Sequence, residues 1–82
     1  IDTQAAQVTI TLPASPTIGD EVSFMDVSPS GGFATNKVTI NRNSQPIRGA
    51  ASNLELVANN QSIKLRYTNA TKGWQYVYNV TS

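Results

Sequence analysis

The sequence predicts an all-β domain, folded as a small antiparallel β-sandwich or β-prism. Stretches in which apolar and polar residues alternate recur along the chain, and this period of two is that of a strand with one buried face. Clusters of Gly, Pro, Asn and Ser separate these stretches, and no window shows a sustained helical period. About six short strands joined by such turns are typical of sandwiches, prisms and small barrels.

Two predicted strands have a single apolar face. Residues 8–12 read Val-Thr-Ile-Thr-Leu, and prolines follow closely, so we expect the strand to end there. Residues 38–41 place Val38 and Ile40 on one face and two polar side chains on the other. The turn-forming order Asn-Ser-Gln-Pro at 43–46 then predicts that the chain doubles back.

The predicted strand at 21–27 is apolar on both faces. Val22 and Phe24 share one face, while Met25 and Val27 lie on the other. A strand that is apolar on both sides in so small a domain predicts cover from a neighbouring subunit.

Two further segments predict loops. Residues 28–32 read Ser-Pro-Ser-Gly-Gly and predict a hairpin-type loop. A Gly-rich loop can bind phosphate, but neither a helical pattern nor a Lys-Ser or Lys-Thr pair follows this one. The Ala pair at 50–51 is compatible with a single helical turn, but Gly49 and Asn53 flank it, so an irregular connection is predicted instead. Apolar residues then return at positions 54, 56 and 57.

The last two predicted strands are 62–67 and 74–80. The first alternates between three inward apolar side chains and two outward cations, Lys64 and Arg66, which favour solubility and discourage edge pairing. The second places four side chains on one face: Trp74, Tyr76, Tyr78 and Val80.

Three of these rings, Trp74, Tyr76 and Tyr78, form the aromatic stripe, which is the main candidate for a binding site. If exposed, the stripe would be a platform on which sugars or bases stack, with positive charge from Lys64, Arg66 or Arg42 nearby. If buried, it would be part of the core or of a subunit interface. The buried interpretation is favoured, because aromatic side chains contribute the largest apolar area and this chain has few other rings.

Composition excludes several classes of chemistry. The 82 residues contain no Cys and no His, which excludes disulfides, Cys- or His-based zinc sites and His-dependent nucleophilic catalysis. A net charge of +1 gives no strong attraction to nucleic acid or to an anionic membrane. No apolar run approaches the roughly 20 residues of a membrane helix. Partner chains remain as the main extra source of buried surface for a domain of this size.

The acidic residues predict no active site. They are Asp2, Asp20, Glu21, Asp26 and Glu55, and no two of them are spaced to converge on a substrate as a glycosidase pair does. A calcium site built from Asp20, Asp26 and nearby carbonyls stays open as an alternative, although the chain has no dense acidic loop. The sequence therefore predicts a protein that is not an enzyme, with no catalytic residue, no assigned metal and no cofactor.

The domain organisation is simple. Residues 1–7 have no pattern and are predicted to be a linker or the end of an upstream element, and residues 8–82 are predicted to be one β domain. The chain begins with Ile1 rather than Met, so we expect it to be a piece of a longer protein. Apolar residues that lie away from the predicted core are candidates for an oligomer interface: Met25, Val27, Val57 and Val77.

A series of short motifs resembles a repeat module of structural proteins from tailed bacteriophages. It includes Val-Thr-Ile-Thr-Leu-Pro-Ala-Ser-Pro near the start and Ile-Lys-Leu-Arg-Tyr near the end. In order, the motifs lie at 8–16, 18–22, 24–26, 33–36, 38–43, 47–50, 54–56, 63–67 and 73–74. The family usually has Asn-Gly where this chain has Asn43-Ser44, so a type I′ turn is not a firm expectation there, whereas strand pairing is.

The resemblance implies a non-enzymatic, trimeric structural domain of a virion, in a tail fibre, a tail tip or a capsid decoration (cement) protein. The implied partners are further copies of this chain and other virion proteins, with no nucleic acid and no membrane. The implied location is the virion, an extracellular particle whose proteins are made in the host cytoplasm. The alternative is a receptor-binding tip that recognises bacterial surface polysaccharide through exposed aromatic side chains.

Overall fold

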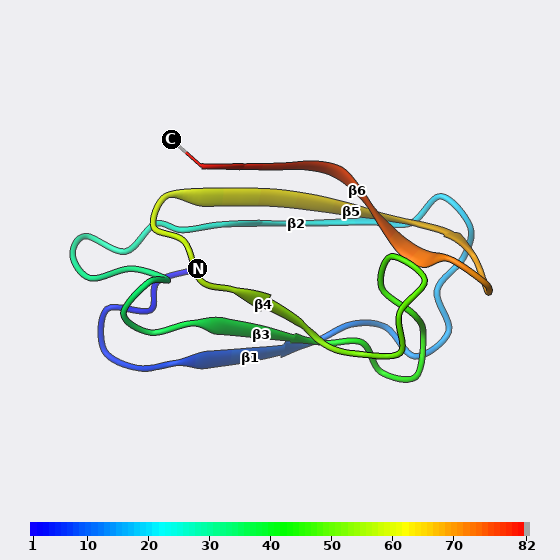
Figure 1. Cartoon of the computed structure of the whole chain (residues 1–82), viewed down its shortest axis with the longest axis horizontal. Coiled ribbons are helices and arrows are strands. Elements are labelled where there is room, and N and C mark those ends of the chain that lie inside the picture. The colour runs from blue at the N-terminus through cyan, green and yellow to red at the C-terminus, as the bar shows by residue number, and fades with distance from the viewer. Residues whose placement is uncertain (82) are drawn as a thin grey trace.

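The computed structural model describes residues 1–81, which form six strands and no helix, so these residues include no helix that could span a membrane. One three-stranded sheet has the order β1-β3-β4 and the other β2-β5-β6. The sheets lie face to face as two layers (Figure 1), which confirms the all-β class and fits the predicted sandwich. The strands are β1 (Val8–Thr11), β2 (Glu21–Met25), β3 (Val38–Asn41), β4 (Leu54–Leu56), β5 (Gln61–Asn69) and β6 (Gly73–Thr81).

The core lies between the two sheets. The alternation of apolar and polar residues along the strands predicts these core positions correctly. Val38 and Ile40 of β3 and Ile63 and Leu65 of β5 are all fully buried. Each such side chain stabilises the fold by roughly 1.5–3 kcal/mol. The buried apolar set comprises Leu12, Phe33, Val38, Ile40, Ile47, Leu56, Ile63, Leu65, Tyr67 and Trp74.

Strands β1 and β3 run parallel, with Val8 beside Val38 and Ile10 beside Ile40. The other strand pairs among the described residues are antiparallel, so this pair departs from the predicted antiparallel architecture. The reason is topological. Strand β2 lies between β1 and β3 in sequence but belongs to the opposite sheet, so the chain crosses the sandwich and returns in its original direction.

Strand β4 lies just after the predicted irregular connection, in a segment where the sequence predicts no strand. Its Leu54 pairs with Ile40 and its Leu56 with Val38, so both leucines face the core beside a buried strand. Three residues are too short a pattern to be recognised in sequence, and pairing with β3 decides their conformation.

Strand β6 does not alternate as predicted. Tyr76 pairs with Leu65 and Tyr78 with Lys64, so Val77 is an extra residue at a β-bulge. Cross-strand partners share a face, which places Tyr76 on the core side with Leu65 and Tyr78 on the outer side with Lys64. The prediction that the whole aromatic stripe shares one face is therefore wrong, because the bulge reverses the alternation after Tyr76.

A tight turn follows β3. The Gln45 N–H donates to the Arg42 carbonyl at 3.2 Å, and the two central residues, Asn43 and Ser44, have φ angles of 50° and 74°. Positive φ at both central positions is the signature of a type I′ turn. The turn favoured by Asn-Gly thus forms here with Ser in the Gly position.

The first three residues of the chain lie against the sandwich. Thr3 is fully buried; its backbone N–H donates to Ser28 Oγ at 2.8 Å and its carbonyl accepts from Asn36 Nδ2 at 2.8 Å. The Ile1 carbonyl accepts from the Val27 N–H at 2.9 Å. Residues 1–7 contain no strand, but their first part packs with the rest of the domain.

Candidate functional site

The rings of the aromatic stripe lie in three different environments. Trp74 is fully buried and packs edge to face against Tyr67, with ring centroids 5.5 Å apart. Tyr76 is half-buried, and Tyr78 is 42% exposed on the other side of its sheet. The structure therefore places Trp74 in the core and does not assemble a platform of three rings.

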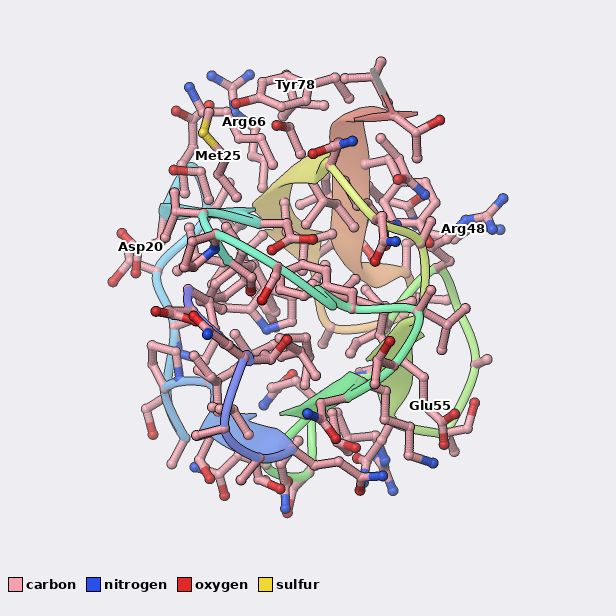
Figure 2. All side chains as sticks on the ribbon, turned by 90° about the vertical axis from the view of Figure 1, so that its left-hand side faces the viewer. Asp20, Met25, Arg48, Glu55, Arg66 and Tyr78 are labelled. Atoms are coloured by element: carbon pink, nitrogen blue, oxygen red, sulfur yellow. The ribbon has the colours of Figure 1, made fainter. Side chains whose placement is uncertain are left out.

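An outer apolar patch, formed by Met25, Tyr78 and Val80, lies on the solvent side of the β2-β5-β6 sheet. Met25 and Val80 flank Ser62 in one cross-strand row, and Tyr78 lies in the next row beside Lys64. Figure 2 shows Met25 and Tyr78 together at this face, at the top of the view. Their exposed fractions of 56%, 42% and 54% leave apolar side chains open to solvent on β2 and β6, on either side of the polar Ser62 and Lys64 of β5.

The four predicted interface residues are all exposed, but they do not form one surface. Met25 and Val27 lie at and beyond the end of β2, whereas Val57 follows β4 in the other sheet. Val77 lies at the bulge of β6. The sequence does not predict that Val80 lies near Met25. The bulge at Val77 turns Val80 to the outer side of the sheet, and no residue type near Val77 indicates a bulge.

Strand β6 forms one edge of its sheet. At its start the Trp74 N–H donates to the Pro46 carbonyl at 2.9 Å, and the Trp74 carbonyl accepts from the Arg48 N–H at 2.8 Å. After Trp74, the strand pairs only with β5 among the described residues. Its nine residues include no charged residue and no proline, so apart from the bulge at Val77 it lacks the usual features that prevent edge pairing.

The two outward cations of β5 bind a carboxylate across the β2–β5 pair. Lys64 Nζ lies 3.0 Å and Arg66 Nη2 2.8 Å from the Glu21 carboxylate. The hydrogen bond from Lys64, with the charges of both cations, lowers the pKa of Glu21 below its ordinary value. A third pair joins Lys37 to Glu55 at 3.2 Å.

A hollow of about 280 Å³ opens between the β3–β4 connection and β6. At its rim the Arg48 guanidinium carbon lies 4.6 Å from the centroid of the Tyr76 ring, a cation–π contact. Of the three cations predicted near the stripe, Lys64 is the cross-strand partner of Tyr78, and Arg42 contacts this hollow through its backbone N–H, which donates to Asn53 Oδ1 at 3.1 Å. The lining residues are Ile47, Arg48, Ala50, Ser52, Asn53, Leu54 and Tyr76.

Sequence reasoning misses Arg48, because its position depends on a backbone conformation that residue types do not encode. Its φ of 54° is left-handed, and its N–H is bonded to the Trp74 carbonyl of β6. A lone Arg before Gly in a polar connection is the available sequence signal, and it is weak.

A second hollow, of about 180 Å³, surrounds the Asp26 carboxylate. That carboxylate accepts hydrogen bonds from the backbone N–H groups of Ser28 at 3.0 Å, Phe33 at 3.2 Å and Asn60 at 3.1 Å. Burial disfavours the charged form, but these hydrogen bonds outweigh it and lower the pKa of Asp26. A negative charge makes the Gly-rich loop unsuitable for phosphate. The lining residues are Asp26, Ser28, Pro29, Ser30, Gly31, Gly32, Asn59 and Asn60.

The calcium alternative is not supported by the positions of its two carboxylates. Asp20 precedes β2 and Asp26 follows it, so they lie at opposite ends of that strand. Asp20 instead accepts a hydrogen bond from the Thr17 N–H at 2.8 Å, a contact within its own turn. Within residues 1–81, no group of three or more acidic side chains lies close enough together to hold a metal ion.

Neither the known protein-family models nor the curated protein sequences contain a match to this chain.

Proposed function

We propose that this chain is a non-enzymatic structural domain of a bacteriophage virion, in a tail fibre or a capsid decoration protein. It works by packing its β-sheets against further copies of itself in a homotrimer and against other virion proteins. The resemblance of its motifs to phage structural modules supports the virion assignment, and its surface supports the mode of action.

The observation that carries this proposal is the outer apolar patch of Met25, Tyr78 and Val80. Monomeric proteins rarely leave large contiguous apolar surface exposed, and such patches mark sites of association. The patch adjoins the uncharged edge of β6, which offers backbone groups to a partner strand as well.

Association also suits the size of the domain. A chain of 82 residues without disulfides buries a smaller share of its surface than a larger domain does, so a partner surface adds burial that the single chain lacks. Packing against further copies stabilises the folded form by mass action and covers the edge of the sheet.

The test is the solution mass of charged variants. We expect Val80→Asp to raise the dissociation constant of the assembly roughly tenfold or more, because an unpaired charge would be buried in each copy. Light scattering across a dilution series measures this shift toward the monomer mass. Val77→Asp, on the edge strand β6, is also expected to raise the dissociation constant.

The matched control is Ile18→Asp. Ile18 is 72% exposed, but it precedes β2, at the opposite end of that strand from Met25, so its substitution is expected to leave the mass unchanged. A wild-type chain that stays monomeric at every concentration contradicts the proposal. So does an equal effect of the Ile18 and Val80 substitutions.

The exposed ring of Tyr78 favours a second candidate function, a receptor-binding tip that recognises bacterial surface polysaccharide. Burial of Trp74 leaves Tyr78 as the most exposed ring of the stripe. The dilution series separates the two candidates, since a folded monomer would leave the Tyr78 face free for a glycan.

A further inference from the structure

We infer that the hollow beside Tyr76 binds a small carboxylate-bearing molecule with the size and polarity of one hexuronic acid ring. The hollow lies on the side of the sandwich where β4 and β6 are the edge strands, and Figure 2 shows Arg48 on this side, opposite Asp20. The outer apolar patch lies on the solvent side of the β2-β5-β6 sheet, whereas the hollow opens between the β3–β4 connection and Tyr76 of β6.

The charge around the hollow is positive and not neutralised. Among the described residues, the ion pairs of Glu21 and Glu55 are made with other cations, and Arg48 has no carboxylate within ion-pair distance. None of the lining residues is acidic.

The polar groups of the hollow are mainly hydrogen-bond donors. The Arg48 guanidinium has five N–H donors and forms no ion pair within residues 1–81. The Asn53 Oδ1 accepts from the Arg42 N–H, and the Asn53 amide adds two N–H donors. Ser52 and Tyr76 add hydroxyls. A ligand that fits these groups must be rich in acceptors, and an anion fits best.

The exposed guanidinium of Arg48 lies against the Tyr76 ring, with 4.6 Å between its central carbon and the ring centroid. The backbone of Arg48 is fixed to β6 by the hydrogen bond from its N–H to the Trp74 carbonyl, and the next residue, Gly49, donates to the Lys72 carbonyl at 2.9 Å. A guanidinium is planar and favours a planar carboxylate, which accepts two parallel hydrogen bonds from it.

The rest of the hollow fits a small ring. Ile47, Ala50 and Leu54 supply an apolar wall, which the C–H groups of a sugar ring can contact. A volume of about 280 Å³ lies near the lower limit of small-molecule sites, roughly 300–1,000 Å³, so one ring fits rather than a chain of several. Inorganic phosphate would use the cation but not the wall.

The experiment is a titration of the isotope-labelled wild-type chain with D-glucuronate, followed by ¹H–¹⁵N NMR. We expect saturable shifts confined to residues 47–54 and to Tyr76. Arg48→Gln should weaken binding roughly tenfold or more, because hydrogen bonds to a charged group exceed the ~1.4 kcal/mol that corresponds to a factor of ten. Glutamine keeps the β-carbon, so the left-handed backbone at this position is under the same strain.

Arg66→Gln is the matched control. It removes the same charge from the same residue type. Arg66, however, lies on the solvent side of the β2-β5-β6 sheet, where Lys64 still pairs with Glu21 in the variant. Its affinity for glucuronate should equal that of the wild type.

Three other probes separate the parts of the ligand. Glucose tests the ring without the carboxylate, acetate the carboxylate without the ring, and inorganic phosphate another anion, and each should bind more weakly than glucuronate. The inference is overturned if glucuronate causes no saturable shift, or if glucose or phosphate binds as tightly as glucuronate. It is also overturned if the Arg48→Gln variant binds glucuronate as tightly as the wild type does. These outcomes are independent of the light-scattering result, which tests assembly alone.

Discussion

Ser44 occupies a backbone conformation that suits glycine better than serine. Its φ of 74° lies in the left-handed region, which costs an L residue about 1–2 kcal/mol, whereas glycine enters it freely. Glycine at position 44 would remove this cost from the folded state, but part of the resulting stabilisation is offset by the greater conformational freedom of glycine in the unfolded chain. We expect Ser44→Gly to raise the free energy of unfolding by about 0.5–1 kcal/mol, measured by urea denaturation.

The control for this prediction is Ser15→Gly. Ser15 is also exposed and in a connection, but its φ is not positive, so glycine there brings the unfolded-state cost without relief of strain. We expect no gain in stability from it. If both substitutions changed the free energy of unfolding equally, strain at Ser44 would be the wrong explanation.

At the level of elements, the start of β6 depends on the absence of a side chain at Gly73. A β-carbon there would lie 1.8 Å from the Pro46 carbonyl oxygen, which accepts the hydrogen bond from the Trp74 N–H. Both contacting groups are backbone, so the clash cannot be relieved by a side-chain rotation. We expect Gly73→Ala to lower the free energy of unfolding by more than about 4 kcal/mol, the range of severe core defects.

Gly49 is the matched control for Gly73. Its φ of 78° is close to the 67° of Gly73, but a β-carbon on it would meet only the flexible Lys72 side chain, at 3.7 Å. Gly49→Ala should therefore show the conformational cost alone, about 1–2 kcal/mol. Urea denaturation of both variants measures the difference, and similar losses would mean that the contact with Pro46 is not the cause.

The elements also differ in how far the sequence predicts them. Strands β1, β3 and β5 are predicted because their alternation places the same side chains inward that the structure buries, such as Ile40 and Leu65. The second half of β6 is not, since one extra residue at Val77 moves every later side chain to the opposite face. The hollow beside Arg48 is not predicted either, because a left-handed backbone and a contact between distant segments create it.

At the level of the whole molecule, stability should depend on pH in acid but hardly at all near neutrality. The chain has no His, so no side chain with an ordinary pKa between about 5 and 8 is present. Hydrogen bonds and charges lower the pKa of Glu21 from 4.5 and that of Asp26 from 3.8 in the folded state. A folded-state pKa below the unfolded one adds stability that is complete above the unfolded value and disappears as the pH falls through the folded value.

We therefore expect the free energy of unfolding to be level from pH 7 to about pH 5 and to decline below about pH 4.5, where the unfolded chain takes up protons first. Urea denaturation at each pH, followed by the emission of the single buried Trp74, measures this profile. Asp26→Asn should be less stable than the wild type at pH 7, because an amide cannot accept from the Ser28, Phe33 and Asn60 N–H groups as a carboxylate does. The same variant should lose less stability between pH 5 and pH 3. Parallel wild-type and Asp26→Asn profiles over that range would show that Asp26 does not contribute to the acid sensitivity of the fold.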